Sequence, residues 1–196
     1  MTTRGSGRSR ASGSEGSRRT YIIVGAIAAL FIAGFIALVV IDTRQRAASS
    51  PPGEVQTYDV GPPGQHTEAD VDYEQIPPPG GEHNPVWQNS GFYEEPVRDE
   101  NAVHTLEHGA VWIAYSPDLP ADQQDRIREL VEGQTCVLAS PYPGLDSPIV
   151  ASAWSKQLSL DDANSPDLER FIRAYRQGPQ TPEVGATCTG GTSATE

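Results

Sequence analysis

Residues 110–115 read AVWIAY, a short apolar run that Ser116 and Pro117 close. A run of this length, with turn residues directly after it, is typical of a buried strand. We expect regular structure to begin near this run, after Val103, and to continue toward the C-terminus.

The sequence that follows alternates helical and strand patterns. Apolar residues spaced for one face, with Gly or Pro at the ends, indicate the helices, and short apolar runs indicate the strands. In chain order these are a helix at 120–132, strands at 135–139 and 148–156, and a helix at 166–177. The order β-α-β-β-α predicts a compact two-layer α+β domain. A split β-α-β sheet and a thioredoxin-like sheet are both open within that class.

The segment 61–101 is rich in proline and glycine, yet it carries large apolar side chains. Rings of this size need burial, whereas the prolines prevent regular elements. We therefore expect an ordered coat of Pro/Gly-rich loops over the core. The apolar residues are Tyr73, Ile76, Trp87, Phe92 and Tyr93. The predicted domain spans 61–190, and a disordered tail is expected at 191–196.

Residues 21–41 (YIIVGAIAALFIAGFIALVVI) contain no charged residue. A helix of this length spans ~31 Å, which matches the hydrocarbon core of a bilayer and predicts a single transmembrane helix. Five arginines precede it and only Arg44 and Arg46 follow closely, so the N-terminus is expected in the cytoplasm. Residues 1–20 then form a disordered basic cytoplasmic tail, and 42–60 a linker. A cleaved signal peptide, with Arg18 and Arg19 resembling a twin-arginine signal, is the alternative.

Charge is divided unevenly along the chain. The net charge is -12, and residues 50–196 hold 7 basic and 24 acidic residues, a net of -17. Such a surface repels phosphate backbones, so nucleic acid is not an expected partner. The membrane is the expected partner, and an envelope protein is a second candidate.

Cys136 and Cys188 are the only two cysteines, and the C-x-x-C redox motif is absent. An isolated pair in a compact domain outside the cytoplasm predicts a disulfide. Free thiols and metal ligation are the alternatives.

All four histidines fall between positions 66 and 108. His104 and His108 stand four apart in VHTLEHG, which lets both rings project from one face of a helical turn and bind one metal ion. We predict a metal site formed by His83, His104 and His108, with Glu107 and His66 as further candidates. Imidazole ligands without a nearby thioether suit copper or zinc.

Two other interpretations of the histidines remain. HTLEH matches the H-x-x-E-H pattern of zinc peptidases, in which the Glu activates water. The strand that follows at once leaves no long helix for that motif. Alternatively, the histidines only hydrogen-bond the coat to the core.

The order of these motifs resembles a bacterial family known as domain of unknown function 3105, over about residues 55–190. The resemblance implies a single-pass membrane protein with an extracytoplasmic domain and implies no activity. His83, His104 and His108 match the family pattern, and His66 matches a less regular histidine. Residues 77–82 read PPPGGE where the family pattern reads Pro-Pro-Thr-Ser-Gly. The residues that carry the resemblance are Tyr73, Pro77, Pro78, Gly81, His83, Asn84, Pro85, Trp87, Gly91, Tyr93, Val103 to Val111, Pro141 to Pro143, Ala153 and Trp154.

The sequence therefore favours a membrane-anchored extracytoplasmic domain that binds copper or zinc through histidines. The second hypothesis is a metal-free envelope scaffold that binds proteins through Trp87, Phe92 and Tyr93. A zinc hydrolase is a third, and no triad order, phosphate loop or cofactor fingerprint supports an enzyme.

Overall fold

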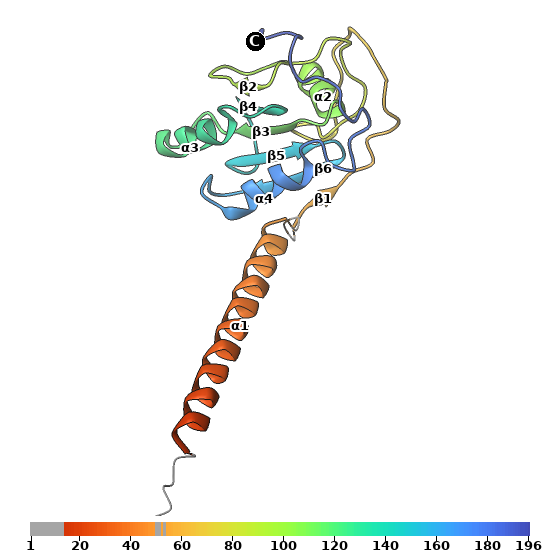
Figure 1. The fold of residues 1–196 in the computed structure, drawn as a ribbon. Coiled ribbons are helices and arrows are strands. Elements are labelled where there is room, and N and C mark those ends of the chain that lie inside the picture. Colours follow the sequence, from red (N-terminus) through yellow and green to blue (C-terminus); the bar gives the residue numbers. More distant parts are fainter. Residues whose placement is uncertain (1–13, 50–51, 53) are drawn as a thin grey trace, which may run out of the picture. The chain divides into compact units, whose positions relative to one another are not determined.

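The computed structural model describes residues 14–49, 52 and 54–196. The chain divides into two compact units, the first ending at Ala48 and the second running from Ser49 to Glu196 (Figure 1). Residues 1–13 of the predicted cytoplasmic tail lie outside the described residues.

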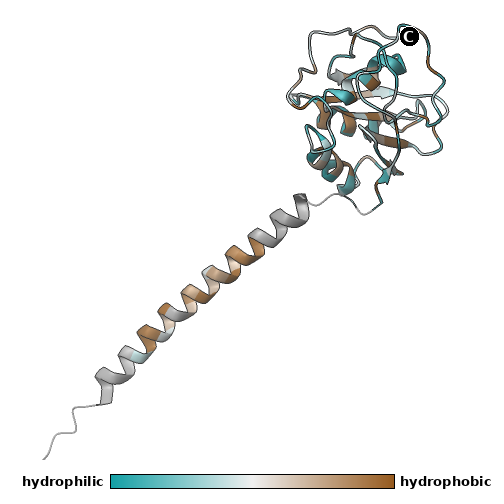
Figure 2. Cartoon of the chain, turned by 90° about the vertical axis from the view of Figure 1, so that its right-hand side faces the viewer, coloured by the Kyte–Doolittle hydropathy of each residue, from teal (hydrophilic) through white to brown (hydrophobic). Residues whose placement is uncertain are grey.

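The first unit contains all of helix α1 (Ser14–Ser49) except its last residue. Its segment Tyr21–Ile41 is long and apolar enough to cross a membrane, and none of its most apolar window is buried inside the protein. Figure 2 shows this band of hydrophobic residues along α1. A signal sequence near an N-terminus has the same length and composition, so the segment by itself leaves anchor and signal open.

The second unit is built on one six-stranded sheet with strand order β1-β6-β5-β3-β4-β2. Strand β3 runs parallel to β4 and antiparallel to β5, and β5 and β6 form an antiparallel hairpin. The strands are β1 (Gln56–Thr57), β2 (Gly91–Phe92), β3 (Val111–Tyr115), β4 (Val137–Pro141), β5 (Ile149–Ala153) and β6 (Lys156–Leu160).

Alternating side chains divide the core between the two faces of the sheet. Val111 and Ile113 of β3 face helices α3 (Ala121–Val131) and α4 (Pro166–Tyr175). Trp112 and Ala114 face the opposite side, where helix α2 (Asp99–Glu107) packs. Figure 1 shows the three helices around the sheet.

The predicted α+β class is confirmed, and the element order is richer than expected. The segment predicted as one strand at 148–156 forms most of a hairpin, because the chain turns at Trp154 and Ser155 and returns as β6. Since β3 and β4 are adjacent, the β3-α3-β4 unit is not split, whereas β2 and β3, which α2 connects, lie on either side of β4. The order β4-β3-β5-β6 agrees with the thioredoxin-like alternative.

The ends of the second unit are more regular than the sequence suggested. Within the predicted linker 42–60, Gln56 and Thr57 pair with β6. The sequence predicts a disordered tail at 191–196, but Thr192 forms a bridge with Gln88 and the Glu196 N–H donates to the Pro96 carbonyl. Backbone hydrogen bonds to the coat therefore order this tail.

Candidate metal centre

Helix α2 lies between the sheet and the coat, and eight of its nine residues are buried. Ala102, Val103 and Leu106 face the sheet. The helix ends at Glu107, and the chain turns away from it at Gly109, whose φ of +91° is a conformation that glycine adopts without strain.

The polar side of α2 is hydrogen-bonded to the coat. Asn101 Nδ2 donates to the Val86 carbonyl, and Thr105 Oγ1 donates to the Gln88 carbonyl at 2.7 Å. In return, the Gln88 N–H donates to the Asn101 carbonyl. These bonds replace water for buried polar groups and fix the coat on the helix.

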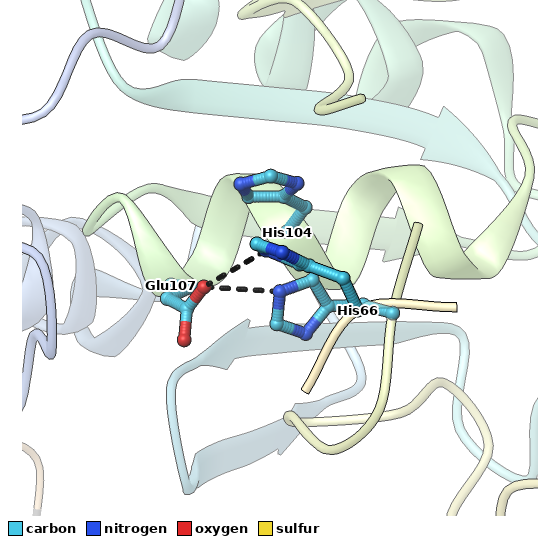
Figure 3. A group of neighbouring side chains, drawn as sticks. His66, His104 and Glu107 are labelled. Atoms are coloured by element: carbon cyan, nitrogen blue, oxygen red, sulfur yellow. Dashed lines mark hydrogen bonds and ion pairs between the residues drawn. The ribbon is translucent and has the colours of Figure 1, made fainter. Parts of the chain in front are cut away.

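His66, His83, His104 and Glu107 meet beside α2, and we call these four residues the histidine–glutamate cluster. One potential ligand atom from each lies within 4.8 Å of the other three. Figure 3 shows His104 and Glu107 projecting from the helix, with His66 next to them. Because His104 and Glu107 are three residues apart, they share one face of the helix.

Two of the imidazoles are oriented by backbone carbonyls. His83 Nδ1 lies 2.7 Å from the Gly81 carbonyl oxygen, and His104 Nδ1 lies 2.6 Å from that of Asn84. A carbonyl oxygen only accepts, so each Nδ1 carries the proton. In a neutral ring the lone pair is then on Nε2, the arrangement found in metal-ligating histidines whose other nitrogen is held by a carbonyl.

Glu107 brings a carboxylate into this buried site. Its side chain is 0% exposed, and Oε1 accepts the Gly64 N–H at 2.6 Å. Oε2 lies 3.0 Å from His83 Nε2, so a lone pair faces a carboxylate oxygen unless a proton or a cation lies between them. Among residues 54–196, Glu107 forms ion pairs with histidines only, at 3.0 Å with His83 and 4.0 Å with His66.

A shared proton would satisfy His83 and Glu107 but not the rest of the cluster. Burial lowers the pKa of His104 to about 4 with a smaller contribution from the neighbouring histidines, although the hydrogen bond to the Asn84 carbonyl acts in the opposite direction. At neutral pH this ring therefore adds a lone pair rather than a positive charge.

The size of the cluster is compatible with a metal ion after a small contraction. The centre of a tetrahedron with 4.8 Å edges is ~2.9 Å from its corners, and zinc ligands lie at ~2.0 to 2.2 Å. The ligand atoms would each have to move by ~1 Å or less.

His108, a predicted ligand, lies outside the cluster. Its ring neighbours that of His104 at 4.6 Å, but Nδ1 is bonded to the Thr187 carbonyl and Nε2 lies 3.4 Å from Glu183 Oε2. His108 is the C-cap of α2, and the four-residue spacing does place its ring beside that of His104, but both of its ring nitrogens contact groups outside the cluster. The H-x-x-E-H arrangement, with both histidines as ligands and a free Glu, does not match this geometry.

Other residues singled out in the sequence are packed into the domain. Cys136 and Cys188 lie at disulfide distance, with sulfurs 2.05 Å apart, in agreement with the predicted bridge. Trp87 packs against His108, Phe92 stacks on Tyr115, and the Tyr93 hydroxyl donates to the Asn89 carbonyl. The aromatic residues that the scaffold hypothesis relies on are therefore half-buried and make contacts within the domain.

A family model described as protein of unknown function (DUF3105) matches residues 65–190. The chain belongs to this family. The DUF3105 match contains every residue of the histidine–glutamate cluster and both cysteines. No curated protein and no solved structure matches the chain.

The sequence did not reveal the backbone groups that hold the DUF3105 cluster together. The Gly81 and Asn84 carbonyls and the Gly64 N–H have no side-chain signature, and their positions depend on how the coat folds. The signal available was the histidine clustering itself, which includes His66.

Proposed function

We propose that this protein binds one divalent transition metal ion, copper or zinc, through His83, His104, Glu107 and His66. The observation that supports this most directly is the convergence of two carbonyl-oriented imidazoles on a buried carboxylate without a lysine or arginine partner among residues 54–196. A divalent ion would neutralise the carboxylate and use the lone pairs that face it.

The donor set favours copper and zinc among the common ions. Imidazole nitrogen suits both, whereas magnesium and calcium prefer sites made of oxygen donors. The two cysteines pair with each other, and the sequence has one methionine, Met1. Soft sulfur donors that would select Cu(I) are thus not part of this donor set.

We further propose that the domain is anchored by 21–41 and lies outside the cytoplasm, where it handles or structurally uses the metal. The apolar helix supports the anchor, and the cysteine pair supports an oxidising compartment. The excess of arginine before the helix supports the orientation.

Metal content decides the proposal. The full chain, purified in detergent, is equilibrated with Zn(II) or Cu(II), desalted and analysed for bound metal. We expect one equivalent for the native chain and a loss of binding for Glu107→Gln and for His83→Gln.

The matched control is His108→Asn, because Asn can still donate to the Thr187 carbonyl. We expect this variant to keep the full equivalent. A native chain without bound metal would refute the proposal, and a loss in His108→Asn equal to that in His83→Gln would refute the ligand set.

A further inference from the structure

The four residues of the histidine–glutamate cluster are held to different degrees. His83 is 0% exposed, and His104 and Glu107 are also buried. Each also has a second side-chain atom that is hydrogen-bonded to the backbone. His83 bonds to the Gly81 carbonyl, His104 to the Asn84 carbonyl, and Glu107 to the Gly64 N–H. Turning any of these side chains away would leave buried polar groups without hydrogen-bond partners, which is unfavourable.

His66 is held differently. Its side chain is 44% exposed, and its one polar side-chain contact within residues 54–196 is the 4.0 Å approach to Glu107. Its backbone is fixed, because it forms a bridge with His83 in which the Thr67 N–H donates to the His83 carbonyl and the His83 N–H donates to the Gln65 carbonyl. The ring can therefore turn toward solvent while its Cα stays beside the cluster.

This difference resembles the distinction between closed and open metal sites. Structural zinc sites keep four protein ligands, whereas two histidines and a glutamate with a free fourth position form a site that accepts a water or another small ligand. The three fixed residues supply that two-histidine, one-glutamate set.

We propose that His66 is an exchangeable ligand. His83, His104 and Glu107 retain the metal ion, and the solvent-side position alternates between His66 and a small exogenous donor such as water, an anion or an imidazole. This assignment rests on the proposed function, because it concerns the same metal ion.

The test uses the full chain in detergent loaded with Co(II), whose visible absorption reports its ligands. Sodium azide and free imidazole are the probes. In the native chain we expect each probe to change the spectrum without releasing cobalt. In His66→Ala we expect one bound cobalt, a fall in affinity of about tenfold or less, and tighter binding of imidazole, which fills the vacated position.

Two comparison variants make the result specific. Glu107→Gln, which keeps an acceptor for the Gly64 N–H, should lower cobalt affinity by about a hundredfold or more. Gln65→Ala changes an exposed neighbour of His66 on the same loop and should behave as the native chain.

Failure of this assignment is distinguishable from failure of the proposed function. A native chain that binds no cobalt overturns both. Bound cobalt with a spectrum that neither azide nor imidazole changes in the native chain and in His66→Ala overturns the exchangeable position alone. His66→Ala could also lose cobalt as completely as Glu107→Gln does. That result would overturn the exchangeable position as well, because it indicates a closed four-ligand site.

Discussion

Each buried imidazole of the cluster has two nitrogens with different surroundings. The Nδ1 atoms of His83 and His104 bind coat carbonyls, as the purely structural interpretation of the histidines requires. The Nε2 atoms remain for a second partner. Fixing the coat and binding a metal are therefore compatible, because one ring can do both.

The substitution Glu107→Gln distinguishes a metal site from a pair in which His83 and Glu107 share a proton. The glutamine amide can accept the Gly64 N–H and donate to His83 Nε2, so it removes a buried charge without leaving a polar atom unpaired. In chelator we expect the variant to equal or exceed the native chain in its free energy of unfolding, by up to about 2 kcal/mol.

With saturating zinc, we expect the native chain to have a higher free energy of unfolding than Glu107→Gln. At a hundredfold excess over its dissociation constant, zinc stabilises the native chain by ~2.7 kcal/mol, and the variant gains little. Denaturant titrations with and without zinc measure both values. If the variant instead loses several kcal/mol in chelator, a protonated His83 paired with Glu107 is the better description.

At the scale of elements, the end of helix α2 depends on Gly109. A Cβ there would lie 2.8 Å from Thr181 Cγ2 and 2.9 Å from Gln177 Nε2, in addition to the strain of φ at +91°. We expect Gly109→Ala to lower the free energy of unfolding by about 2 kcal/mol or more.

Gly133, which follows α3, provides the control for backbone strain alone. Its φ is +71°, and a Cβ would meet nothing within 4 Å. Gly133→Ala should therefore cost only about 1 kcal/mol. Equal losses of stability in the two variants, measured by chemical denaturation, would mean that the contacts around Gly109 contribute nothing.

The elements also show what the sequence could predict. The strand at 110–115, the two later helices and the strand at 135–139 have clear apolar patterns, and the structure contains all of them as β3, α3, α4 and β4. Helix α2 was missed because both of its sides are buried, so polar residues that bind the coat replace the usual exposed face. The β5–β6 hairpin was missed because Trp154 and Ser155 are not typical turn residues, although Ser155 adopts a φ of +59°.

The histidine–glutamate cluster was predictable only in part, because some of the contacts that form it have no pattern in the sequence. The spacing of His104 and His108 indicates a shared face, and their rings do lie side by side, but the nitrogens of His108 contact Thr187 and Glu183. Glu107 supplies the ligand atom that the sequence assigns to His108. The approach of His66 to His83 depends on a bridge between two irregular segments, which has no periodic pattern.

At the scale of the whole molecule, the predicted topology can be tested directly. Protease added to intact spheroplasts should digest residues 50–196, because the positive charge before 21–41 favours retention of the N-terminus inside. N-terminal sequencing should recover a chain that still contains 21–41. Full protection of the domain, or a mature N-terminus after Ile41, contradicts the prediction.

The cysteine pair should stabilise the second unit as a whole. The pair closes a loop with a sequence separation of 52, for which chain entropy gives about 4 kcal/mol. Replacing both cysteines by serine should lower the free energy of unfolding by that order, measured by denaturation. The native chain in reductant should show a similar fall, and an unchanged stability in both cases would indicate free thiols in solution.

The bridge between His66 and His83 has a consequence for the coat. The same two residues form a backbone pair and supply two of the four converging side chains, so a bound ion would close the loop between them a second time. Opening of that loop and release of the ion would then be one coupled event. Amide hydrogens on both sides of the bridge, such as those of Thr67 and His83, would exchange with deuterium at a rate set by metal occupancy, while those of β3 and β4 would exchange independently of it.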